Sequence, residues 1–111
     1  MYRATTPQHD FLFDVDPQTT FKRILITYAQ NNQIVLEKTE ADLTYSQVAD
    51  PEDGTIYKAS FRMTQEETKK FDPNTMNVQL QLRFRDWNDH VVASPVVKIR
   101  LDKVLNDEVL T

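Results

Sequence analysis

Two runs of β-branched and aromatic residues surround a pair of asparagines in residues 21–38. Their sequence, FKRILITYAQNNQIVLEK, suits a pleated surface that is buried on one side. A two-residue hairpin turn requires positive φ at both central positions, and asparagine tolerates that conformation. Asn31 and Asn32 therefore predict a β-hairpin, with strands at 21–29 and 33–38, and the rest of the chain is expected to pack around it.

Apolar and polar residues alternate in five further segments, which predicts a strand in each. These segments are 9–15, 43–48, 55–63, 77–85 and 91–103. The alternation is incomplete in the second, which indicates an edge or irregular strand, and Pro95 indicates a bulge or edge position in the last. The side chains expected on the inner faces are those of Phe11, Phe13, Val15, Ile24, Ile26, Tyr28, Ile34, Leu36, Tyr57, Ala59, Phe61, Met63, Val78, Leu80, Leu82, Phe84, Val97, Ile99 and Leu101.

One segment, residues 64–71, departs from the period of two. Thr64 is followed three residues later by Glu67, which is the pattern of a helix capping box. Pro73 pushes the residue before it out of the helical region and so ends the segment. We therefore expect one or two helical turns that cross from one sheet to the other, with Phe71 filling the end of the sandwich.

The strand count and spacing predict the fold class. A chain of 111 residues is long enough for one domain and too short for two independent cores. Six or seven strands with one crossover helix are typical of an all-β, immunoglobulin-like antiparallel β-sandwich. We expect a single domain over residues 1–111, with an N-terminal arm at 1–9, the sandwich at 10–103 and a C-terminal tail at 104–111.

Composition argues against several classes of protein. The chain has no cysteine, which excludes disulfides and thiolate chemistry, and its net charge of -4 disfavours binding to nucleic-acid phosphates. No apolar run approaches the ~20 residues that span a bilayer, so no membrane partner is expected. The first residues lack the apolar core of a secretory signal, which predicts synthesis in the cytoplasm without secretion.

The residues that could carry chemistry do not form a recognisable catalytic or metal-binding pattern. His9 and His90 lie at opposite ends of the chain, and no local ligand spacing accompanies either of them. A single glycine, Gly54, excludes a glycine-rich phosphate loop. We therefore expect no catalytic residue, no metal, no cofactor and no enzymatic activity.

Trp87 is the feature that most suggests a ligand, because it lies in a turn where its ring can be exposed. A tryptophan at a loop tip can stack on a sugar ring or anchor an interface, or it can fold over the end of the sandwich. Tyr45 and His90 are the other residues that could contribute to an interface or ligand site. The three residues form the predicted site.

Five segments of the chain carry a resemblance to a known family. These are RATTPQHDFLF, ILITYAQNNQIVLEK, MTQEETKKF, VQLQLRFRDW and ASPVVKIRLDKVLNDEVL. Together they resemble a family of small proteins in phages and prophages of gut Firmicutes, and the strand order is similar to that of immunoglobulin-like N-terminal domains of baseplate upper proteins. The chain departs from the family pattern in having Ala4 in place of a glycine and an extra stretch, VADPEDG.

The resemblance implies a virion structural protein of the tail, the baseplate or the head, acting through contacts with other virion proteins and with copies of itself. Polar terminal segments and sheet edges would make those contacts, for example by strand addition. Two alternatives remain open. One is a carbohydrate-binding module that uses Trp87 and Tyr45 on host surface glycans, and the other is a phage protein that binds a host factor.

Overall fold

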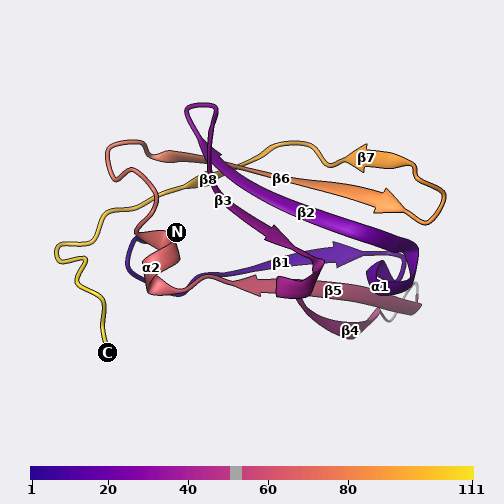
Figure 1. Cartoon of the computed structure of the whole chain (residues 1–111). Helices are drawn as coiled ribbons and strands as arrows, with labels where there is room; N and C mark the ends of the chain where they lie inside the picture. Colours follow the sequence, from indigo (N-terminus) through magenta and orange to yellow (C-terminus); the bar gives the residue numbers. More distant parts are fainter. Residues whose placement is uncertain (51–53) are drawn as a thin grey trace.

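Two antiparallel sheets pack face to face in the computed structural model, which describes residues 1–50 and 54–111 (Figure 1). The first sheet has the strand order β1-β5-β4, and the second has the order β3-β2-β6, with β7 and β8 both paired to β6. The predicted all-β, immunoglobulin-like sandwich is confirmed. The described elements are β1 (Gln8–Phe13), α1 (Pro17–Thr20), β2 (Phe21–Gln30), β3 (Gln33–Thr39), η1 (Glu40–Asp42), β4 (Thr44–Asp50), β5 (Gly54–Arg62), α2 (Gln65–Thr68), β6 (Asn77–Asp86), β7 (Val91–Ala93) and β8 (Val97–Arg100).

The hairpin of β2 and β3 forms as predicted. Asn31 and Asn32 have φ angles of 51° and 63°, the left-handed conformation that a primed two-residue turn requires. A bulge interrupts the pairing, because Leu36 lies opposite Tyr28 while Ile34 lies opposite the next residue along β2. The bulge reverses the expected facing of Ile34, whose side chain is 62% exposed instead of buried.

The core lies between the two sheets and draws on both. From the five-stranded sheet, β2 and β6 supply alternate residues that are almost fully buried, in the phase that the sequence predicts. From the three-stranded sheet, β5 supplies Ala59 and Phe61. The buried apolar residues are Ile24, Ile26, Tyr28, Leu36, Leu43, Ala59, Phe61, Met63, Phe71, Val78, Leu80, Leu82 and Leu101.

Helix α2 crosses from β5 in one sheet to β6 in the other, as predicted (Figure 1). The Thr64 hydroxyl accepts a hydrogen bond from the Glu67 N–H, and the Glu67 carboxylate accepts one from the Thr64 N–H. Phe71 is buried and packs edge-on against Tyr28, with 6.1 Å between ring centroids. The capping box and the aromatic plug are therefore both confirmed.

Three expectations about strands differ from the structure. The predicted strand at 91–103 is divided at Pro95 into β7 and β8, which raises the number of described strands to eight. Val97 begins β8 with its side chain half exposed, so it does not belong to the core. Val15 lies beyond the end of β1, which stops at Phe13, and is also partly exposed. The cluster Asp50-Pro51-Glu52-Asp53-Gly54 predicts a turn between the strands at 43–48 and 55–63, and residues 51–53 of that turn lie outside the described residues.

The two ends of the chain lie against each other. The Met1 ammonium group donates a hydrogen bond to the Arg100 carbonyl oxygen at 2.9 Å, and Tyr2 forms a parallel β-bridge with Asp102. Residues 1–9 are therefore not a free arm, since the first residues pair with the chain beyond β8 and β1 begins at Gln8. The tail at 104–111 folds back, because the Gln65 side chain exchanges two hydrogen bonds with the backbone of Leu110.

No helix within residues 1–50 and 54–111 is long and apolar enough to cross a membrane.

Candidate functional site

Trp87 and Tyr45, which are distant in the sequence, line one surface depression of about 220 Å³. Trp87 comes from the turn that follows β6, and Tyr45 comes from β4 in the other sheet. Helix α1, the start of β2 and the turn η1 complete the walls. The remaining lining residues of this Trp87 depression are Pro17, Gln18, Phe21, Lys22, Glu40 and Ala41.

The indole ring of Trp87 is exposed but held at one edge. Its Nε1–H donates a hydrogen bond to the Thr19 carbonyl oxygen at 3.0 Å, and 64% of the residue remains accessible to solvent. The Lys22 ammonium nitrogen lies 6.0 Å from the ring centroid. The Trp87 side chain therefore lies outside the core and is held by one hydrogen bond, and the rest of its ring remains available for contact.

Tyr45 is also fixed by a hydrogen bond. Its hydroxyl group donates to the Glu40 carbonyl oxygen at 2.9 Å. Partial burial raises the pKa of the Tyr45 hydroxyl, and the negative charge of Glu40 raises it further. The hydroxyl is therefore a protonated donor at neutral pH, and the lone pairs of its oxygen can accept a hydrogen bond from a ligand.

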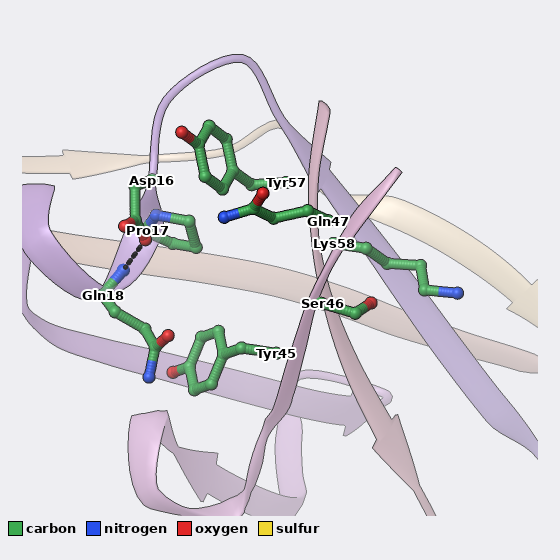
Figure 2. Close-up of a pocket in the computed structure, with 8 residues that line it drawn as sticks. All are labelled: Asp16, Pro17, Gln18, Tyr45, Ser46, Gln47, Tyr57 and Lys58. Carbon is green, nitrogen blue, oxygen red and sulfur yellow. Dashed lines mark hydrogen bonds between the residues drawn. The ribbon is translucent and has the colours of Figure 1, made fainter. Parts of the chain in front are cut away.

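A second depression has a volume of about 110 Å³ and is lined in part by two tyrosines (Figure 2). Tyr45 and Tyr57 project from neighbouring strands toward residues 16–18, with the Gln47 amide between the two rings (Figure 2). The side chains of Ser46 and Lys58 point away from it (Figure 2). This Tyr57 depression shares Pro17, Gln18 and Tyr45 with the Trp87 depression.

Helix α1 forms the wall that the two depressions share. Asp16 caps it by accepting a hydrogen bond from the Gln18 N–H at 3.0 Å, and Pro17 occupies the first helical position. Aspartate before proline is a common start of a helix, so this pattern could have predicted the turn. Helix α1 was nevertheless not predicted, because a proline at this position is also a common end of a strand.

His90 lies apart from the other two residues of the predicted site. It is exposed, its Nδ1 lies 3.4 Å from a carboxylate oxygen of Asp86, and it does not line either depression. The hydrogen bond donated by the His90 backbone N–H is the largest cause of the lowered pKa of Asp86. His90 therefore lies in the turn between β6 and β7. Of the three residues of the predicted site, only Trp87 and Tyr45 line the same depression.

Among the described residues, no three histidine or acidic side chains gather closely enough to hold a metal ion.

No protein-family model, curated protein or solved structure matches this chain. Its function is therefore inferred from the surface of the molecule.

A second surface feature follows the β7–β8 edge. Four valines along it are each between 51% and 56% exposed: Val91, Val92, Val96 and Val97. The alternation over 91–103 predicts one strand with Val97 inside, and it therefore does not indicate these exposed valines. Two pairs of consecutive valines were the available signal, since neighbouring residues of a strand face opposite ways and one of each pair must point outward.

Proposed function

We propose that this chain is a non-enzymatic structural protein of a phage virion, in the tail, the baseplate or the head, which binds neighbouring subunits through its β7–β8 edge. The exposed row of four valines is the observation that carries the proposal. Val92 and Val97 lie on the same face of the edge, opposite Phe84 and Leu80 of β6, and exposed apolar side chains grouped along an edge are typical of interaction surfaces. The resemblance of the chain to small phage and prophage proteins supports the same function.

The backbone of the edge favours a partner strand. Within the described residues, β7 and β8 pair as strands only with β6. The other side of each strand is open except at the end of β8, where the Arg100 carbonyl oxygen accepts a hydrogen bond from the Met1 ammonium group. Open strand edges attract further strands, and proteins use such addition to join subunits. Pro95 divides the edge into two short lengths, so a partner would form few backbone hydrogen bonds with either. The valine side chains would therefore contribute much of the contact.

The partners of this edge are other virion subunits, including further copies of this chain. Many identical copies in one particle can each make a weak contact, and the contacts together hold the assembly. A short edge with four half-exposed valines can supply one such weak contact in each copy.

Mass spectrometry of purified particles of the encoding phage tests the proposal. We expect the polypeptide in wild-type particles, and an about tenfold lower amount in particles that carry Val92→Lys, because a buried edge charge disfavours association. Ile34→Lys is the matched control, since Ile34 is 62% exposed on the opposite edge strand of the same sheet. Particles that lack the wild-type polypeptide, or that incorporate both variants equally, would contradict the proposal.

A further inference from the structure

We propose that the Trp87 depression and the adjoining Tyr57 depression together bind a neutral carbohydrate chain. This site goes beyond the assembly function, because neither depression includes Val92, Val96 or Val97 of the β7–β8 edge. The combination of Trp87, Tyr45 and Tyr57 with amide groups around two connected hollows carries the inference.

The aromatic rings provide the stacking surfaces. One face of a sugar ring presents C–H groups, which pack favourably on an indole or phenol ring. The hydrogen bond from Trp87 to Thr19 already orders the indole, and the hydrogen bond from Tyr45 to Glu40 orders the phenol. A ligand would therefore lose less of its binding energy to the ordering of these side chains.

The polar groups around the depressions match sugar hydroxyls. Gln18 is exposed on the wall that the depressions share, and Gln47 lies between the rings of Tyr45 and Tyr57 (Figure 2). Each amide both donates and accepts hydrogen bonds, as a hydroxyl does, so the groups can pair in either direction.

The charges around the Trp87 depression favour a neutral ligand. Lys22 and Glu40 both line it, so the positive and negative formal charges on its walls balance. An anionic ligand would approach Glu40 and would also meet a chain of net charge -4. A neutral sugar avoids this repulsion.

The arrangement of the hollows indicates a chain of sugar units. Two depressions with the common wall Pro17, Gln18 and Tyr45 can receive consecutive rings, with Trp87 against one and Tyr57 against the next. Both are small and shallow, so we expect a dissociation constant on the order of 0.1–1 mM for one site, which many copies in a particle would strengthen.

Fluorescence titration tests binding directly, because Trp87 is the sole tryptophan of the chain and reports on the site alone. The probes are chitotetraose, cellotetraose and an array of immobilised neutral glycans. We expect a saturable shift of Trp87 emission with at least one soluble glycan from this set. The absence of any saturable change across the set overturns the proposal, as does a shift caused only by another virion protein.

Calorimetric titration of variants with the same glycan locates the site. We expect Trp87→Ala to weaken binding about tenfold or more and Gln18→Ala about threefold, since stacking contributes more than one exposed hydrogen bond. Leu12→Ala is the control, because Leu12 is exposed on β1 and lines neither depression. If Trp87→Ala does not fold, the affinity of Gln18→Ala tests the proposal. This variant should fold, since the α1 cap uses only the backbone N–H of Gln18. Unchanged affinity in the folded variants overturns the proposal.

Discussion

At the scale of single residues, Tyr28 of the core forms a hydrogen bond with the partly buried His9. The Tyr28 hydroxyl lies 2.7 Å from His9 Nδ1, and Tyr28 is fully buried. Burial raises the pKa of Tyr28, with the charge of Glu67 adding to the effect, whereas burial lowers the pKa of His9. Both groups are therefore neutral at pH 7, and they share a hydrogen bond between the Tyr28 hydroxyl and His9 Nδ1.

This pair predicts a pH dependence of stability. The pKa of His9 lies below its ordinary value of 6.5 in the folded chain, so the unfolded chain takes up a proton first as the pH falls. The contribution of His9 is present above pH 6.5 and is lost as the pH drops from there through the folded pKa. We expect the denaturant midpoint to fall between pH 7 and pH 5.5, and His9→Gln to flatten that slope.

Leu12→Ala is the control for this measurement, because Leu12 is exposed and has no titratable group. It should leave the slope between pH 7 and pH 5.5 unchanged. An equally steep slope in the His9→Gln variant would show that other groups cause the loss of stability.

At the scale of elements, the β2–β3 hairpin shows how far local chemistry specifies structure. Both turn asparagines adopt positive φ, and the alternation in β2 places its apolar residues inward. The β3 strand obeys the alternation only in part, since the bulge opposite Tyr28 moves Ile34 to the surface. The turn therefore follows from its two residues, whereas the register beyond it depends on packing against the rest of the sheet.

Substitutions at Asn32 test the turn. Its φ of 63° suits glycine without strain, so Asn32→Gly should be neutral or stabilise the chain by less than ~1 kcal/mol. Asn32→Val should cost about 1–2 kcal/mol, because a β-branched residue is strained in the left-handed region. Urea unfolding measures both changes. A loss above ~1 kcal/mol for Asn32→Gly would show that the asparagine side chain itself stabilises the turn.

At the scale of the whole molecule, Phe71 and Tyr28 join the two sheets at the end nearest α2. Phe71 follows the crossover and packs against Tyr28 of one sheet, and Tyr28 in turn contacts Phe61 of the other, with 6.3 Å between centroids. Nearby, Lys38 of β3 forms an ion pair with Glu67 of the crossover. The crossover segment therefore closes this end of the sandwich with an aromatic cluster and a cross-element ion pair.

Phe71→Ala should cost about 3–5 kcal/mol, since it removes a fully buried ring and leaves a cavity between the sheets. Thermal unfolding followed by circular dichroism measures the loss. Leu12→Ala, at a residue that is 65% exposed, should change stability by less than ~0.5 kcal/mol. Similar losses in the two variants would mean that Phe71 does not support the core.

The sequence by itself determined the features that depend on neighbours along the chain. These include the asparagine turn, the inward phase of β2 and β6, and the capping box of α2. Each is encoded by residues a few positions apart, whose interactions form within one element. The all-β sandwich follows from these elements, because their apolar faces must be buried together.

The tertiary structure decided everything that depends on contacts between distant segments. The bulge at β3 and the pairing of the two chain ends both depend on the packing of other elements. The same is true of the placement of Trp87 and Tyr45 around one depression, since these residues come from opposite sheets. Local sequence patterns do not specify contacts between distant segments, because many packings of the same strands bury a similar apolar area.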